Sequence, residues 1–203
     1  MIRNIVFDMG NVLIHWCPDD FLARLELTGE DRSLLRQEVF GCVEWVQTDR
    51  GTLSDERAAA AMKTRLPSRL HWAVDRLMVW WELDLRPMEG MEELLAELKG
   101  LGYRLYLLSN ASVRQPEYFT ALPVDRYLDG RILSSSYKLL KPQPEIYRVL
   151  LQEYDLRAEE CFFVDDLFIN VEAAMLVGMS GAIFRGAAPL RQALAEAGVG
   201  VKV

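Results

Sequence analysis

Cysteine is scarce in this chain of 203 residues, which contains three: Cys17, Cys42 and Cys161. Their odd number and the lack of a C-x-x-C spacing argue against a disulfide framework and against a structural zinc site. Cys161 begins an apolar run, so we expect it to be a small core residue, as free cysteine commonly is.

The sequence also lacks an excess of basic residues. It has 23 Lys and Arg against 30 Asp and Glu, which gives a net charge of -7 and a pI of about 5.0. Proteins that bind nucleic acid usually present a basic face, so we expect no nucleic-acid partner. A small anionic ligand remains compatible with this charge, because a metal, helix N-termini and one or two lysines can hold it.

Long apolar runs are absent too. A helix that crosses a bilayer needs roughly 20 predominantly apolar residues, and no stretch of this sequence approaches that length. Near the start, Asp8 interrupts the apolar segment that a secretory signal would require. We therefore expect a cytoplasmic protein without a membrane partner, acting as a monomer or homodimer.

What the chain does contain is a set of short, β-prone apolar runs that end in polar side chains. Residues 5–7 lead into Asp8, residues 103–108 lead into Ser109 and Asn110, and residues 161–164 lead into Asp165 and Asp166. In an open parallel sheet the carboxyl ends of the strands meet at one crevice, which is where ligands bind. The three runs therefore predict a shared site.

The order of the elements predicts an α/β fold. Strand candidates alternate with helical patterns in the second half of the chain, which favours a Rossmann-like parallel sheet flanked by helices, with right-handed crossovers. The expected strands are residues 3–7, 103–108, 131–133, 161–164 and 181–184, and the expected helices are 89–99, 144–154, 169–177 and 188–197.

Residues 16–85 have a different hydrophobic pattern, with helical periodicity and no convincing strand. We expect helices at 20–27, 31–40, 54–66 and 68–81. A helical insertion of this length after the first strand predicts a small all-helical cap over the strand ends, with Pro18 and Pro87 at its hinges. The domains are then a catalytic core of residues 1–15 and 86–203 and a cap of residues 16–85.

Carboxylates at two strand ends are the first candidates for chemistry. Asp8 can act as a nucleophile or a metal ligand, Gly10 allows the backbone to approach a ligand closely, and Asn11 can stabilise the loop. The adjacent Asp165 and Asp166 repel each other, which at a crevice suggests a bound cation. Asn170 lies in the first turn of the next helix and can orient one of them.

Two further candidates can bind an anion. Ser109 and Asn110 offer hydroxyl, amide and backbone N–H donors at a strand end, although the same residue types also form ordinary turns. Lys141 lies between a short strand and a helix, and Pro142 and Pro144 stiffen its loop, so its ammonium can be aimed inward.

Taken together, these motifs and their order resemble the haloacid dehalogenase (HAD) superfamily. Asp8 matches the nucleophile motif, Ser109 and Asn110 the phosphate-donor motif, Lys141 the lysine motif, and Asp165 and Asp166 with Asn170 the acidic motif. The resemblance covers essentially the whole chain, including a helical cap of the subfamily I kind. D-x-G-N-V at the nucleophile, K-P-x-x-x-I-Y at the lysine and the cap stretch 49–54 look most like a phosphatase group that includes sugar-1-phosphate phosphatases.

The resemblance implies a phosphatase that forms an aspartyl-phosphate on Asp8, which water then hydrolyses. Mg²⁺ would be held by Asp8, the carbonyl of Gly10 and Asp166, while Ser109, the Asn110 backbone N–H and Lys141 would hold the phosphoryl oxygens. Asp165, Asn170 and Asn11 would support these ligands. Positioning and neutralisation of spread negative charge account for most catalysis of this kind.

Gly10 departs from the usual family pattern, which has a second aspartate at this position as general acid and base. General acid–base help is typically worth about 10² to 10⁴ in rate, so its loss matters. His15, Asp19 and Asp20 are candidate replacements. Alternatively, the substrate has a good leaving group, which favours anomeric sugar phosphates or acyl phosphates.

The cap adds aromatic and basic candidates for substrate contact: Trp45, Trp72, Trp80 and Trp81, and Arg24, Arg50 and Arg76. The tryptophans are more often core residues than substrate platforms. Two other functions stay open. One is a non-catalytic or weakly active binding or regulatory protein that lacks the acid. The other is a metal-free 2-haloacid dehalogenase. It needs no proton donor, but without a cation the adjacent Asp165 and Asp166 would repel its anionic substrate.

Overall fold

Five strands form one parallel sheet in the part of the chain that the structure describes. The structure is a computed structural model and describes residues 1–80 and 85–203. The strand order is β3-β2-β1-β4-β5. The strands are β1 (Asn4–Phe7), β2 (Arg104–Ser109), β3 (Gly130–Leu133), β4 (Cys161–Asp165) and β5 (Ser180–Ile183).

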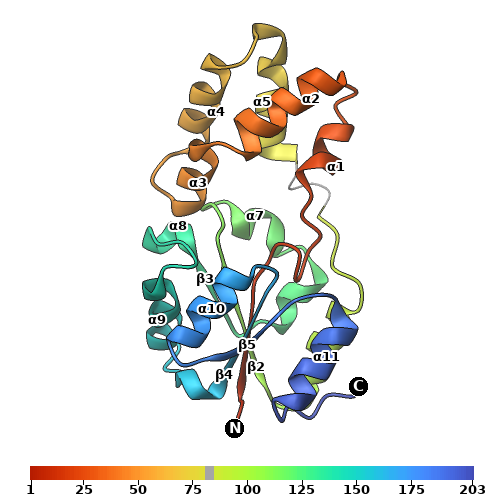
Figure 1. Cartoon of the computed structure of the whole chain (residues 1–203), viewed down its shortest axis with the longest axis vertical. Coiled ribbons are helices and arrows are strands. Elements are labelled where there is room, and N and C mark those ends of the chain that lie inside the picture. Colours follow the sequence, from red (N-terminus) through yellow and green to blue (C-terminus); the bar gives the residue numbers. More distant parts are fainter. Residues whose placement is uncertain (81–84) are drawn as a thin grey trace.

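Helices cover both faces of this sheet (Figure 1). Side chains alternate along β1, so Ile5 and Phe7 belong to one hydrophobic core and Val6 belongs to the other. The first core is closed by α6 (Met91–Gly100) and α11 (Ala187–Glu196), and the second by α9 (Pro144–Glu153) and α10 (Phe168–Leu176). Burial on both faces explains why the central strands read as continuous apolar runs. The predicted α/β, Rossmann-like class is confirmed, with each predicted strand and core helix within two residues of its observed bounds.

The strand register brings the candidate polar residues to one edge. Phe7 pairs with Leu107 on β2 and with Val164 on β4. The next position along the sheet therefore holds Asp8 at the centre, with the carboxyl ends of β2 and β4 on either side. This is the edge at which an open parallel sheet binds ligands.

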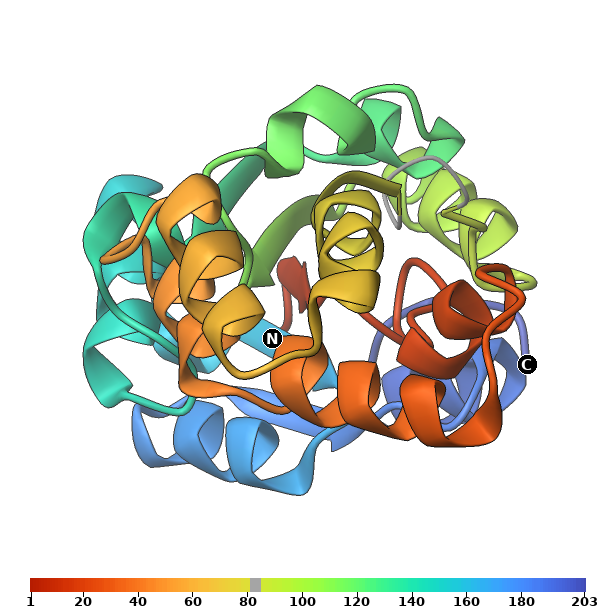
Figure 2. The same cartoon turned by 90° about the horizontal axis from the view of Figure 1, so that it is seen from above.

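A helical segment, residues 18–80, lies beyond this edge of the sheet. Figure 1 shows its helices at the end of the molecule toward which β1 runs, and Figure 2 shows them spread over the sheet from above. Its elements are α1 (Pro18–Ala23), α2 (Gly29–Leu35), the π-helical turn η1 (Arg36–Phe40), α3 (Val43–Arg50), α4 (Asp55–Thr64), the 3₁₀ turn η2 (Ser68–Leu70) and α5 (His71–Trp80).

The helical segment differs from the sequence prediction in three places. The first helix ends at Ala23 rather than at residue 27, and Glu26 has a left-handed backbone. The helix expected over 31–40 changes to a π-helical turn after Leu35. Helix α3 was not predicted. It ends at Gly51, which adopts a left-handed conformation typical of a helix C-terminus.

Two antiparallel linkers connect the helical segment to the sheet. The backbone N–H of Met88 donates to the carbonyl of Leu13 at 2.9 Å, and that of His15 donates to the carbonyl of Arg86 at 2.8 Å. Ile14 and Pro87 form a β-bridge. Pro18 begins α1 at the end of the first linker, whereas Pro87 lies within the second linker, in the bridge to Ile14.

Short elements complete the core: α7 (Gln115–Phe119), η4 (Pro123–Tyr127), α8 (Ser134–Tyr137) and η5 (Ala158–Glu160). Among the helices of the described residues, none combines the length and the apolar character that crossing a bilayer demands.

Candidate active site

Asp8 lies at the centre of the site because it directly follows the central strand. Its backbone N–H donates to the carbonyl of Val164 at 2.8 Å, which holds it against β4. Its side chain is only 13% exposed. Burial raises the pKa of Asp8 to about 6; Lys141 opposes this rise and Asp165 adds to it.

Lys141 bridges the two carboxylates that flank it. Its Nζ lies 2.6 Å from Oδ1 of Asp8 and 2.6 Å from Oδ2 of Asp165, and its side chain is 1% exposed. Burial alone would lower the pKa of Lys141, but the two carboxylates raise it overall. The lysine is therefore a fixed positive charge beside Asp8, as the stiffened loop predicted.

Asp165 is fully buried and saturated with hydrogen bonds. Besides Lys141, it accepts from the side-chain amide of Asn170 at 3.0 and 3.1 Å and from the backbone N–H of Leu167 at 2.9 Å. Lys141 and these hydrogen-bond donors thus compensate the charge of Asp165, which reduces the repulsion expected between Asp165 and Asp166. Asp165 positions Lys141, and Asn170 in turn holds Asp165.

Asp166 is the acid of this pair that faces the pocket. Its Oδ2 accepts from the side-chain amide of Asn11 at 3.3 Å, and the side-chain carbonyl of Asn11 accepts from the backbone of Trp16 at 3.1 Å. Burial raises the pKa of Asp166, although the hydrogen bond from Asn11 lowers it in part. Asn11 has the left-handed conformation (φ 55°) that asparagine tolerates, so the loop after β1 is shaped around this contact.

These acids could hold a divalent cation. Asp8, Asp165 and Asp166 each offer a carboxylate oxygen, and the three oxygens lie within 4.8 Å of one another. Only Asp8 and Asp166 of the three line the pocket, together with Gly10. Hard oxygen donors of this kind fit Mg²⁺, which commonly uses one or two carboxylates and completes its shell with water or phosphate.

Ser109 and Asn110 lie at the end of β2, on the other side of Asp8. Ser109 is 1% exposed and lines the pocket. The side chain of Asn110 accepts from the backbone N–H of Lys141 at 2.8 Å and donates to its carbonyl at 3.1 Å. The asparagine side chain therefore fixes the lysine loop, a role that its position in the sequence did not reveal.

Apart from the fully buried Asp165, these residues line one pocket of about 320 Å³. Its floor is polar and carries Asp8, Ser109, Lys141 and Asp166. Its walls are largely apolar and aromatic: Met9, Trp16, Trp45, Ala111, Tyr118 and Leu167. The ring centroids of Trp16 and Trp45 lie 5.8 Å apart, so the linker and α3 form one aromatic wall.

Asp49 is the acidic residue that the sequence reasoning missed as a site residue. It lies on α3 and lines the same pocket as Asp8 and Gly10. Burial and the nearby Asp55 raise the pKa of Asp49 to about 8, although a hydrogen bond from the Trp45 side chain opposes the rise. The only sequence signal was its place in the stretch 49–54, because its helix was not predicted.

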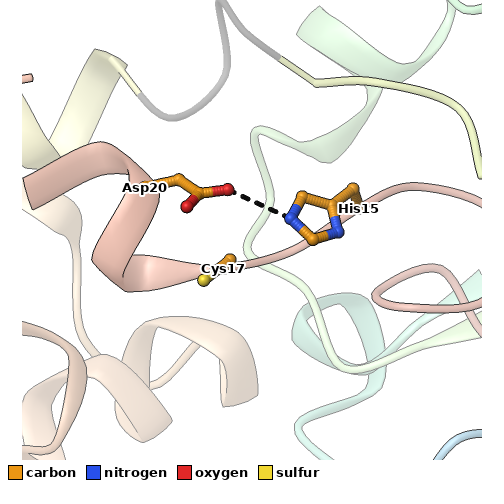
Figure 3. A group of neighbouring side chains, drawn as sticks. All are labelled: His15, Cys17 and Asp20. Carbon is orange, nitrogen blue, oxygen red and sulfur yellow. Dashed lines mark hydrogen bonds and ion pairs between the residues drawn. The ribbon is translucent and has the colours of Figure 1, made fainter. Parts of the chain in front are cut away.

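The residues expected to replace the acid missing at Gly10 lie elsewhere. Figure 3 shows the side chain of His15, on the linker, facing that of Asp20, on α1, with Cys17 beside them. Nε2 of His15 and Oδ2 of Asp20 lie 3.1 Å apart. Asp19 pairs with Arg36 at 2.9 Å. His15, Asp19 and Asp20 are exposed to solvent, and none of them is among the described residues of the pocket wall. That expectation is corrected: local pairing on the surface of the linker and α1 engages these groups.

One of the aromatic and basic residues considered for substrate contact lines the pocket. Trp45 lines the pocket, whereas Trp72 is 46% exposed and lies outside it. Arg24, Arg50 and Arg76 are exposed and are not among the described pocket residues. Trp81 and the side chain of Trp80 fall outside the described part of the chain.

Comparison with known proteins supports the fold and shows the family. Residues 2–178 match the family model described as haloacid dehalogenase-like hydrolase. A sesquiterpene phosphatase, astK, from Aspergillus oryzae is 30% identical over 179 residues, which are 87% of this chain and 86% of that protein. D-ribitol-5-phosphate phosphatase from Bacteroides thetaiotaomicron is 27% identical over 192 residues, 88% of this chain and 89% of that protein.

A solved structure has the same fold. It is a HAD family enzyme of Bacteroides thetaiotaomicron in complex with magnesium and inorganic phosphate, with a TM-score of 0.72 and 22% identity over 92% of this chain and 96% of that one.

The chain belongs to the haloacid dehalogenase-like hydrolase family. The predicted HAD-like hydrolase is confirmed, and both relatives described above are phosphatases. The subfamily and the sugar-1-phosphate group remain predictions.

Proposed function

We propose that this chain is a Mg²⁺-dependent phosphatase that hydrolyses small phosphorylated metabolites through an aspartyl-phosphate on Asp8. The observation that carries the proposal is the placement of Asp8. It lies on the pocket floor, 2.6 Å from a buried lysine and within 4.8 Å of a second pocket-lining acid. A carboxylate nucleophile splits the displacement into two easier steps.

The protein groups divide the work around the phosphoryl group. Asp8 would attack phosphorus with the carboxylate oxygen that Lys141 does not engage. Ser109, the Asn110 backbone N–H and Lys141 would hold the phosphoryl oxygens, and Asp165 with Asn170 would keep Lys141 in place. Fixed donors around the developing charge are the main source of catalysis in such a site.

Asp8, Asp166 and the carbonyl of Gly10 would hold Mg²⁺. The ion would neutralise the carboxylates and the phosphate, so that an anionic nucleophile can meet an anionic substrate. The related solved enzyme, which binds magnesium and phosphate together, is consistent with this proposal.

The helical segment would act as a cap of residues 16–85 on a core of residues 1–15 and 86–203. Trp16, Trp45 and Asp49 reach the pocket from this side. The leaving group, which points away from Asp8 in an in-line displacement, would therefore lie against the aromatic wall.

Two substrate classes fit this wall. Sugar phosphates remain the first, because a tryptophan can stack on the apolar face of a sugar. Phosphates of apolar alcohols are the second, favoured by the apolar lining of the pocket and by the sesquiterpene phosphatase among the relatives. The preference for anomeric phosphates, inferred from Gly10, depends on whether another group donates the proton.

A phosphate-ester screen with Mg²⁺ tests the proposal. It should compare anomeric and non-anomeric hexose phosphates, apolar alkyl phosphates and aryl phosphates, with Asp8→Asn as the matched control. We expect release of inorganic phosphate by the parent protein, loss of at least about 10³-fold in Asp8→Asn, and loss on chelation by EDTA. A parent no faster than Asp8→Asn on every ester would favour the non-catalytic alternative. Release of halide from a 2-haloacid, insensitive to EDTA, would favour the dehalogenase.

A further inference from the structure

We propose that Asp49, on the helical segment, is the general acid and base of this enzyme and takes the role that Gly10 cannot fill. The inference rests on the proposed phosphatase activity. Asp49, on α3, lines the same pocket as Asp8 and Gly10.

The position of Asp49 matches the geometry of the reaction. In an in-line displacement on phosphorus, the nucleophile and the leaving oxygen lie on opposite sides. Asp8 attacks from the floor, at the end of β1, so the leaving oxygen points toward the helical segment. An acid on that wall lies where the proton is needed, whereas His15, Asp19 and Asp20 do not reach the pocket.

The core fixes Asp49 through its own backbone. The hydroxyl of the fully buried Ser134 donates to the carbonyl of Asp49 at 2.5 Å. The same hydroxyl accepts from the backbone N–H of Ala111 at 2.9 Å, and Ala111 lines the pocket just beyond β2. Just after α3, the ammonium of Lys138 donates to the carbonyl of Gly51. The buried Ser134 thus links the loop after β2, which contains Ala111, to the helix that carries Asp49.

The surroundings of Asp49 keep it protonated near neutral pH. The titratable groups that act on it are Asp55 at the start of α4 and Asp8 below it; both are acids and both favour the neutral carboxyl. Arg114 lies 3.8 Å from Asp55 and neutralises part of that charge. The indole of Trp45, one turn earlier on α3, hydrogen bonds with the carboxyl and orients it.

The proposed steps balance. In the first, a carboxylate oxygen of Asp8 forms a bond to phosphorus, the bond from phosphorus to the leaving oxygen breaks, and the Asp49 proton moves to that oxygen to release the alcohol. In the second, the Asp49 carboxylate takes a proton from water, the water oxygen bonds to phosphorus, and the bond to Asp8 breaks. Inorganic phosphate leaves, and both aspartates return to their starting forms.

The test compares Asp49→Asn with the parent on two leaving groups. For an alkyl phosphate we expect kcat/KM to fall by about 10² to 10⁴. For dinitrophenyl phosphate, whose leaving group needs no proton, we expect a burst of phenolate followed by slow turnover, with a phosphoryl group trapped on Asp8 and detected by mass spectrometry. In the parent, activity should fall above about pH 8 as Asp49 loses its proton; this limb should vanish in the variant.

Two further variants keep the test decisive if Asp49→Asn folds poorly. Asp49→Glu keeps a carboxyl and should retain part of the alkyl phosphatase activity. Gly10→Asp placed in the Asp49→Asn background should restore it, because a Cβ at position 10 lies 3.6 Å from Trp16 and fits. Asp75→Asn is the matched control, since Asp75 is 61% exposed and pairs with Lys63.

The proposal is overturned if Asp49→Asn keeps the parent's kcat/KM on the alkyl phosphate, or if it loses activity equally on both esters with no burst. In either case the parent still outpaces Asp8→Asn, so the phosphatase assignment survives. A parent that hydrolyses no ester would instead remove the proposed function itself.

Discussion

At the scale of single residues, the site is governed by how three buried charges compensate one another. Lys141 lies 2.6 Å from both Asp8 and Asp165, and all three side chains are nearly excluded from solvent. Removing one partner of a buried pair leaves an uncompensated charge, which costs more than the pair contributes. The same arrangement that holds the nucleophile therefore also supports the fold.

Lys141→Met should abolish turnover and destabilise the protein. We expect the free energy of unfolding to fall by about 3 to 5 kcal/mol, because Asp8 and Asp165 would face each other without the ammonium. Urea denaturation followed by circular dichroism measures this. Lys63→Met is the control, since its partner Asp75 is 61% exposed and the pair is expected to contribute about 0 to 1 kcal/mol. Equal losses in the two variants would contradict the prediction.

At the scale of elements, the packing of α3 against α8 decides where Asp49 lies in the pocket. Gly51 ends α3 with φ of +71°, and a Cβ added there would lie 2.4 Å from the carbonyl oxygen of Ser135. Only glycine allows this close approach in this backbone conformation. The contact between the helical segment and the core is therefore made through backbone, a feature that residue types alone do not specify.

Gly51→Ala should displace α3 and lower turnover. A shift of about 1 Å at a catalytic group can cost up to about 100-fold, so we expect a loss of this order in kcat. Gly102→Ala is the matched control: Gly102 also has a positive φ, +87°, but no atom lies within 4 Å of its added Cβ. Both variants carry backbone strain, so a decrease in stability alone does not decide the matter. Similar kcat values in Gly51→Ala and Gly102→Ala would count against the role of this contact.

At the scale of the whole molecule, the sheet gathers acids that are far apart in sequence. Asp8 and Asp166 are separated by most of the chain, yet their carboxylates lie within 4.8 Å because β1 and β4 are neighbours. Burial raises the pKa of both groups, so the charged pair is costly without a cation. Binding of Mg²⁺ should therefore be linked to the stability of the fold.

Mg²⁺ should raise the midpoint of thermal unfolding. A ligand present at 100 times its Kd adds about 2.7 kcal/mol to the free energy of unfolding. Asp166→Asn should show a much smaller rise in this midpoint, because one of the two carboxylates proposed to hold the ion is gone. Asp75→Asn should respond as the parent does. Scanning fluorimetry with and without Mg²⁺, at fixed ionic strength, measures the difference; an undiminished rise in Asp166→Asn would place the ion elsewhere.

The sequence by itself determined the sheet and the floor of the site. Apolar runs that end in Asp8, Ser109 and Asp165 predict parallel strands with polar carboxyl ends, because a strand buried on both faces must be apolar throughout. The structure confirms the five predicted strands and the four predicted core helices, residues 89–99, 144–154, 169–177 and 188–197, within two residues of their bounds.

Tertiary structure alone decided which polar groups meet above that floor. The side chain of Asn110 hydrogen bonds with the backbone of Lys141, a contact that the sequence did not predict. Asp49 reaches the pocket on α3, a helix that the sequence pattern did not predict. Helix α3 is short, and its ending depends on a backbone contact with α8 across the molecule. Local periodicity carries no record of such a contact, because the atoms that make it belong to residues more than eighty positions apart.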